Sequence, residues 1–172
     1  MSKILKKFFI TILAIILPIL NVYAMPYDSS DYTSVDELSE LLPKDIREDV
    51  AIEPSVRRGD FFAQAELIIT DEGDGNIGAL AIAYLDHSVD EVYITIYLDQ
   101  WNEETEKWQQ VAYYDAEFYE KDYPDGLTNP DVNITFLDQE RDHYYRLRSV
   151  FSAIDGDDYE GFSPTTAGIW ID

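Results

Sequence analysis

The clearest pattern in the chain is an alternation of apolar and polar side chains between residues 92 and 99. The apolar positions are Val92, Ile94, Ile96 and Leu98, and the positions between them are Tyr93, Thr95, Tyr97 and Asp99. Successive side chains of a β-strand point to opposite faces, so a period of two predicts a strand with one face buried.

Six further stretches have the character of short strands. They cover residues 61–70, 77–87, 108–119, 131–137, 143–153 and 165–171. Turn residues separate them, as at Asp74-Gly75-Asn76 and Pro124-Asp125-Gly126. Seven short strands with no helical period among them predict an all-β domain over residues 58–172, a seven-stranded antiparallel β-sandwich.

The residues after Leu137 indicate the type of sandwich. Immunoglobulin and fibronectin type III domains often carry a tyrosine near the start of strand F, with its hydroxyl bonded back to the preceding corner. Tyr144 and Tyr145 are near that position, and the alternation directs Tyr145, Leu147 and Phe151 inward and their neighbours outward. A hairpin between Trp101 and Trp108 also favours the fibronectin type III arrangement.

Several segments together resemble a family of small secreted bacterial proteins of unknown function. They are RGDFF, VYITIYLDQW followed by EKWQQVA, HYYRLRS and TTAGIWI. The resemblance spans Arg58 to Ile171. It implies export and an immunoglobulin-like β-sandwich, and it brings no catalytic residue to this chain.

Residues 1–24 have the composition of a cleaved signal peptide. Three lysines precede an apolar stretch from Phe8 to Leu20, and small residues lead to a cleavage site between Ala24 and Met25. The stretch is short and contains Pro18, which disfavours a membrane-spanning helix. We expect a secreted protein with no membrane span after cleavage; an uncleaved anchor helix is the alternative.

Residues 25–57 are acidic, contain prolines and have few large apolar side chains. Ser34 and Glu37 fit a capping box, with Val35, Leu38, Leu41 and Leu42 on one side of a short helix that Pro43 ends. The segment therefore predicts an acidic spacer with one short helix. Whether it docks on the sandwich is open.

Charge limits the classes of partner. The chain has 12 basic and 35 acidic residues, a formal net charge of −23, and the expected cleavage removes three lysines. Such a surface repels phosphate backbones and anionic lipids, which argues against nucleic-acid binding. The chain also lacks cysteine, so thiol chemistry and disulfides are excluded.

No motif for catalysis stands out. The two histidines, His87 and His143, are far apart in the sequence and belong to no Ser/His/Asp arrangement. We assign no catalytic residue and favour a non-enzymatic protein. A carboxylate-based glycan hydrolase stays open, because its acid pair is defined by separation in space.

One loop is a candidate calcium site. Asp155, Asp157, Asp158 and Glu160 lie in an acidic, glycine-containing loop, and calcium prefers oxygen ligands. The spacing does not fit an EF-hand, and aspartate and glycine are common in turns. A solvated turn is favoured over bound calcium, and no other cofactor is expected.

The aromatic side chains give the strongest indication of a binding surface. Six residues are expected on one outer face of neighbouring strands: Tyr93, Tyr97, Trp101, Tyr144, Arg146 and Arg148. Flat aromatic rings stack on sugars, and arginine recognises carboxylate or sulfate. The alternative is a ladder of cross-strand contacts, including arginine on tyrosine, that stiffens the sheet.

Arg58-Gly59-Asp60 matches the integrin-recognition tripeptide. It directly precedes the apolar pair Phe61-Phe62, which should enter the first strand, so a lead-in turn is favoured over integrin binding. The sequence thus favours an extracellular recognition or adhesion module for a glycan or protein. The alternatives are the glycan hydrolase and a structural, self-assembling surface protein.

Overall fold

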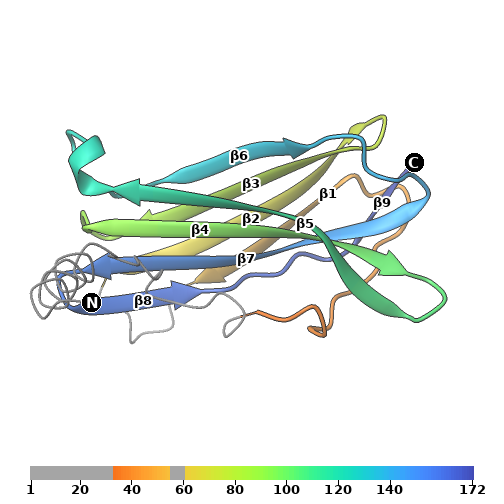
Figure 1. Ribbon diagram of the computed structural model, residues 1–172, viewed down its shortest axis with the longest axis horizontal. Coiled ribbons are helices and arrows are strands. Elements are labelled where there is room, and N and C mark those ends of the chain that lie inside the picture. The colour runs from red at the N-terminus through yellow and green to blue at the C-terminus, as the bar shows by residue number, and fades with distance from the viewer. Residues whose placement is uncertain (1–32, 55–60) are drawn as a thin grey trace, which may run out of the picture.

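The computed structural model describes residues 33–54 and 61–172. Within these ranges the chain is all-β, with two antiparallel sheets packed face to face (Figure 1). The strands are β1 (Glu48–Pro54), β2 (Phe62–Gly73), β3 (Asn76–Leu85), β4 (Glu91–Asn102), β5 (Lys107–Tyr119), β6 (Asp131–Phe136), β7 (His143–Asp155), β8 (Asp158–Phe162) and β9 (Ile169–Ile171). One turn of 3-10 helix, η3 (Glu120–Asp122), follows β5.

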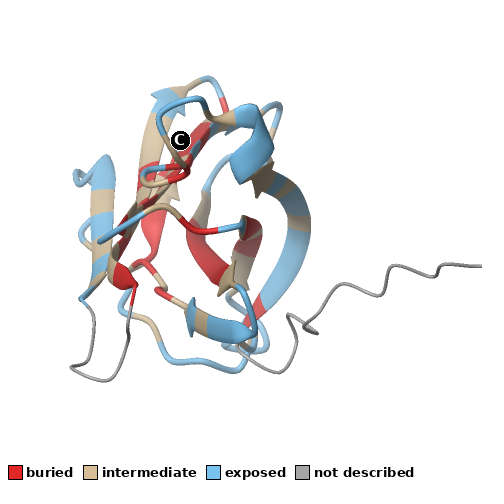
Figure 2. Cartoon of the chain, turned by 90° about the vertical axis from the view of Figure 1, so that its left-hand side faces the viewer, coloured by how far each residue is buried: buried red, intermediate tan, exposed pale blue. Residues whose placement is uncertain are grey.

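One sheet has the order β1-β2-β3-β6 and the other the order β5-β4-β7-β8. β9 pairs with the start of β7, and β8 pairs with its end. The apolar positions of β4, from Val92 to Leu98, are fully buried between the sheets. Figure 2 shows the buried residues on the facing sides of the two sheets.

Each of the seven expected strands coincides with an observed strand, but the described residues contain nine. The two additional strands are β1 and β8. β1 alternates exposed and half-buried positions at the edge of its sheet, where Val50 and Ile52 are exposed beside acidic residues. β8 is short and contains Gly161, so its composition is that of a loop.

Tyr145 makes the corner contact expected of a tyrosine near the start of this strand. Its hydroxyl donates to the backbone oxygen of Glu140 at 2.7 Å and accepts from Gln100 Nε2 at 2.7 Å. Tyr145, Leu147 and Phe151 belong to the hydrophobic core, as the alternation predicted. The hydroxyl therefore ties the β6–β7 corner to the start of β7.

Replacing Tyr145 by phenylalanine is expected to lower the free energy of unfolding by about 1–2 kcal/mol, because both hydrogen-bond partners lose the hydroxyl. Urea denaturation followed by circular dichroism measures the change. Tyr144→Phe is the matched control, since no hydrogen bond of the Tyr144 hydroxyl is found among the described residues. Its free energy of unfolding should stay within about 0.5 kcal/mol of the wild-type value. Equal changes in the free energy of unfolding for the two substitutions would contradict a stabilising role for the hydrogen bond from Tyr145 to Glu140.

The helix expected around Ser34 is wrong. The Ser34 backbone oxygen accepts from Glu37 N–H, so the capping residues form a single turn. Leu41 then forms a parallel bridge with Gly168, and Leu38 is almost fully exposed. Tertiary hydrogen bonds hold this segment extended, and Pro43 leaves little length for a helix.

We call residues 33–42 the strap, because they run across the outer face of the β5-β4-β7-β8 sheet. Gly168 N–H donates to Glu40 O at 2.7 Å, and Leu42 N–H donates to Gly168 O at 2.9 Å. Ser39 Oγ donates to Thr166 O at 2.5 Å. The described part of the acidic spacer therefore docks on the sandwich.

Residues 1–32 and 55–60 lie outside the described residues. The expected signal peptide, its cleavage site at Ala24 and Met25, and Arg58-Gly59-Asp60 fall within them. Phe61 and Phe62, which follow, are buried, and β2 begins at Phe62, one residue after the expected start. In the part of the chain that the structure describes, no helix combines the length and the apolar character needed to cross a membrane.

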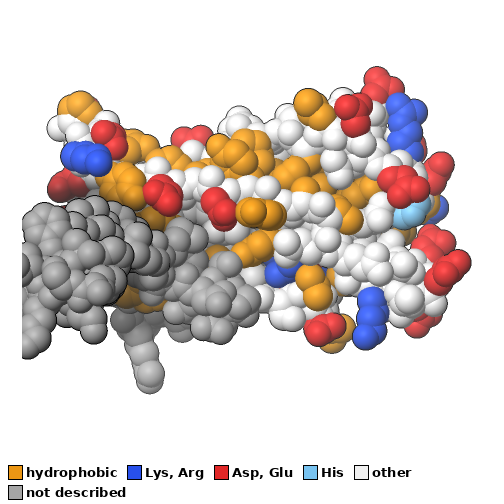
Figure 3. Space-filling view, in the orientation of Figure 1, with side chains coloured by type: hydrophobic (Ala, Val, Ile, Leu, Met, Phe, Trp, Pro, Cys, Tyr) orange, Lys and Arg blue, Asp and Glu red, His pale blue; other side chains and the backbone are white. Residues whose placement is uncertain are grey.

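The surface in Figure 3 is that of the sheet containing β4, β5 and β7. Apolar side chains lie along the middle of this face. Acidic side chains gather at the end of the molecule that carries the C-terminus and the β4–β5 hairpin tip. The site described next lies at this end.

Candidate functional site

Two arginines and one aspartate form a buried cluster on the outer face of the second sheet. Asp99 lies directly opposite Arg146 in the β4–β7 register. Its carboxylate accepts from Arg146 Nε at 3.1 Å and from Arg148 Nε and Nη2 at 2.6 and 3.0 Å. Arg146 and Asp99 are fully buried, and Arg148 is 2% exposed.

The strap covers this cluster. Arg146 donates through Nη1 to Glu37 O at 2.6 Å and through Nη2 to Val35 O at 3.1 Å, while Arg148 Nη1 donates to Thr33 Oγ1 at 3.2 Å. Burial lowers the pKa of Arg146, and Asp99 counteracts that effect. An arginine side chain nevertheless keeps its charge in proteins.

The arginines are therefore on the face that the sequence predicted, but they do not face solvent. An alternating pattern assigns a side chain to a face of a sheet and says nothing about what covers that face. Arg146 stacks over the Trp108 ring at 4.5 Å, and Arg148 stacks over the Tyr97 ring at 4.9 Å. The expected arginine–aromatic contacts are present as internal packing.

The other predicted aromatic residues have different surroundings. Tyr93 is buried in a small cluster with Val150, and burial, followed by its hydrogen bond to Glu91, raises its pKa. Tyr144 packs edge-to-face on Trp170 with ring centroids 5.1 Å apart. Trp101 is partly exposed and lines two surface hollows.

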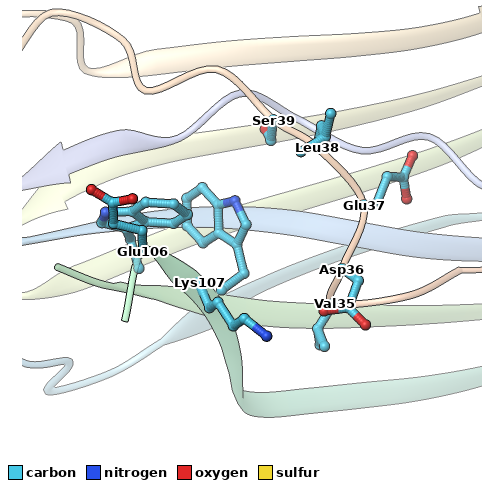
Figure 4. Close-up of a pocket in the computed structure, with 9 residues that line it drawn as sticks. Val35, Asp36, Glu37, Leu38, Ser39, Glu106 and Lys107 are labelled. Carbon is cyan, nitrogen blue, oxygen red and sulfur yellow. The ribbon is translucent and has the colours of Figure 1, made fainter. Parts of the chain in front are cut away.

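The first hollow lies between the strap and the β4–β5 hairpin and has a volume of about 230 Å³ (Figure 4). Its lining residues are Val35, Asp36, Glu37, Leu38, Ser39, Trp101, Glu106, Lys107 and Trp108. Figure 4 shows Glu106 and Lys107 on the hairpin side and residues 35–39 on the other. The strap is therefore a wall of this hollow as well as a cover for the arginines.

The second hollow has a volume of about 300 Å³. It is lined by Gln100, Trp101, Asn102, Glu103, Glu104, Asp142 and His143. Among the described residues, the carboxylates of Glu103, Glu104 and Asp142 have no ion-pair partner. We call this the acidic hollow.

The β4–β5 hairpin holds Trp101 in place. Trp101 pairs directly with Trp108 across the hairpin, edge-to-face, with ring centroids 5.2 Å apart. Asn102 Oδ1 accepts from the backbone N–H groups of Glu104 and Thr105 at 3.0 Å each, which fixes the turn. A β-carbon at Gly168 would lie 2.7 Å from Trp108, so glycine there lets the second indole pack.

The candidate calcium ligands are not brought together. Asp155 Oδ2 lies 3.1 Å from His87 Nε2, and Glu160 accepts from Phe62 N–H at 2.8 Å at the start of β2. Asp157 lies in the β7–β8 turn and Asp158 begins β8, and both are exposed. Within the described ranges, no group of three or more Asp, Glu, His or Cys side chains has the geometry of a metal site.

Sequence reasoning identified Trp101 but missed the strap and the acidic hollow. Glu103, Glu104 and Asp142 lie in two turns 38 residues apart, and only the pairing of β4 with β7 places those turns side by side. No known protein-family model matches the chain, and no match is found among curated proteins.

Proposed function

We propose that this protein is a secreted, non-enzymatic recognition module of the fibronectin type III or immunoglobulin-like type. Leaving β1 aside, β2-β3-β6 opposite β5-β4-β7-β8 corresponds to the order A-B-E opposite C′-C-F-G of such sandwiches. The Tyr145 hydroxyl bond at the β6–β7 corner supports the same type. Many functions occur on this fold, so the function depends on the residues of the site.

The observation that carries the proposal is the position of Trp101 between two hollows. A partly exposed indole on a fixed hairpin offers a large flat contact area with little conformational entropy to lose. Concave sites with a few polar groups around an aromatic side chain are typical of ligand binding. The ligand class that fits a flat ring flanked by polar side chains is a saccharide.

The rings of the two other tryptophans, Trp108 and Trp170, each have a cationic side chain stacked over them. Arg146 lies over the Trp108 ring, and Lys44 Nζ lies 3.0 Å from the centroid of Trp170. Among the described residues, no cation is found over Trp101. The binding surface that we propose is therefore narrower than the tyrosine and arginine face, and it is centred on Trp101.

A glycan hydrolase is a weaker candidate. Its general acid is usually a desolvated carboxyl group that flanks the scissile bond together with a second carboxylate. Glu103, Glu104 and Glu106, beside Trp101, are all exposed on the hairpin. Exposed side chains lack the desolvated surroundings of such a general acid.

Self-assembly through sheet edges is also weaker. β5 is an edge strand with Tyr113 exposed, but a bulge opposite Leu98 and Asp99 interrupts its register, and Asp115 and Glu117 follow. In the other sheet, the edge strand β1 ends at Pro54. Bulges, charges and proline at edges are the usual protection against strand pairing between chains.

Replacing Trp101 by alanine tests the proposal. The chain from Met25 to Asp172 is screened on an array of extracellular glycans, and the affinity for each bound glycan is measured for the wild type and the variant. We expect Trp101→Ala to weaken binding at least about tenfold. Loss of the contact with Trp108 should lower the free energy of unfolding by only about 1 kcal/mol and leave the protein folded.

Trp170→Ala is the matched control, because Lys44 and Tyr144 already cover Trp170. It should leave glycan affinity unchanged. Unaltered binding by Trp101→Ala, or release of shortened glycans by the wild type, would contradict the proposal.

A further inference from the structure

We infer that the docked strap and a glycan bound at Trp101 stabilise one another, and that Arg146 is the positioning residue that couples them. The inference rests on the proposed function and concerns the regulation of that same site. It starts from the first hollow, whose two walls come from separate parts of the chain. The strap forms one wall and the β4–β5 hairpin forms the other (Figure 4).

Arg146 contacts both walls of the first hollow. Its guanidinium donates to the backbone oxygens of Glu37 and Val35 at 2.6 and 3.1 Å, and it lies 4.5 Å from the centroid of the Trp108 ring. Val35, Glu37 and Trp108 all line the hollow. Arg146 does not line it and is fully buried, so a glycan in the hollow cannot contact this side chain. Any effect of Arg146 on binding therefore acts through the walls that it contacts.

The strap is held largely by polar contacts. All side chains of residues 33–42 are exposed or half-buried, and Leu38 is 95% exposed. Besides Arg146, another anchor is the backbone of Gly168, which makes two hydrogen bonds with the strap, at 2.7 and 2.9 Å. Segments with few buried apolar contacts open locally at a lower free energy than the whole protein unfolds. The strap can therefore leave the sheet while the sandwich stays folded.

Glycan binding and strap docking are then linked thermodynamically. A sugar ring that stacks on Trp101 in the first hollow, with its volume of about 230 Å³, lies against strap residues 35–39. Release of the strap removes this wall and leaves the ring in contact with the hairpin alone, so the docked state binds the glycan more tightly. By reciprocity, the bound glycan favours docking of the strap by the same factor.

Amide hydrogen exchange of the wild type tests this coupling without any substitution. The probe is the oligosaccharide of the array that the wild type binds most tightly. At saturation it should slow exchange at least about tenfold at Leu42 and Gly168, whose amides donate the hydrogen bonds between the strap and the sandwich. The control is the amide of Gly156, which donates to Asp90 in the β7–β8 turn at the opposite end of the molecule and should be unaffected (Figure 1).

Replacing Arg146 by leucine tests the same coupling from the other side. The variant should bind the same oligosaccharide at least about tenfold more weakly, although residue 146 touches no sugar. Leu67→Ala is the control for general loss of stability, because Leu67 is fully buried in the core and lines neither hollow. This control should keep the wild-type affinity.

The outcomes separate this inference from the proposed function. If the oligosaccharide leaves exchange in the strap unchanged, the inference is overturned, while loss of binding in Trp101→Ala would still support the proposed function. Equal weakening by Arg146→Leu and Leu67→Ala would also overturn it, because general stability would then explain the effect. A chain that binds no glycan on the array would overturn both. If Arg146→Leu does not fold, hydrogen exchange of the wild type decides.

Discussion

Replacing Asp99 by asparagine is expected to lower the free energy of unfolding by about 3–5 kcal/mol, because two buried guanidinium groups lose their shared counter-ion. Arg146 and Arg148 both donate to this carboxylate, and no other side-chain carboxylate within the described ranges accepts a hydrogen bond from either arginine. Asparagine keeps the shape of the side chain and removes the charge. The two arginines would then repel each other at low solvent exposure.

Urea denaturation of the Asp99→Asn variant measures this effect. Asp115→Asn is the matched control: Asp115 is also on the outer face and accepts from Thr95 Oγ1 at 2.8 Å, but it is exposed. The control should change stability by no more than about 1 kcal/mol. If the two substitutions lower the free energy of unfolding by the same amount, the cluster around Asp99 is not a major source of stability.

Replacing Arg146 by leucine is expected to have the second-largest effect, about 3 kcal/mol, and to release the strap. The side chain supplies hydrogen bonds to two strap carbonyls, those of Val35 and Glu37, and leucine supplies none. Asp99 would keep Arg148 as its partner, so the loss should be smaller than for Asp99→Asn. Packing against Trp108 would also be lost.

Amide hydrogen exchange distinguishes release of the strap from general loss of stability. In Arg146→Leu the amides of Glu37 and Leu42 should exchange at least about tenfold faster, while those of β2 and β3 stay protected. Arg141→Leu is the control, because Arg141 makes an exposed ion pair with Asp74. Unchanged exchange in the strap of Arg146→Leu would show that Arg146 does not hold it.

The alternation of apolar and polar residues in the sequence was sufficient to predict the strands that form the core. It predicted β4 and the inward direction of Tyr145, Leu147 and Phe151, because burial between two sheets follows the period of a strand. It missed β1, whose acidic residues resemble a spacer and whose larger apolar side chains, Val50 and Ile52, lie on the exposed side. Exposed edge strands carry little hydrophobic signal.

The strap shows where local patterns fail. Ser34 and Glu37 fit a helix start, but the carbonyls of Val35 and Glu37 accept hydrogen bonds from Arg146, more than 100 residues away. Tertiary contacts of this kind override local propensity. The burial of Arg146 follows from the same contacts, which is why a residue that alternation assigns to solvent is fully buried.

The most direct test of binding at Trp101 is nuclear magnetic resonance of the tryptophan indoles. The chain has three tryptophans, so three indole N–H signals are expected from the ¹⁵N-labelled protein, and Trp101→Phe assigns one of them. Titration with a glycan that the wild type binds on the array should shift the Trp101 signal strongly and leave that of Trp170 in place. A ligand that shifts Trp170 and leaves Trp101 unmoved would contradict the site.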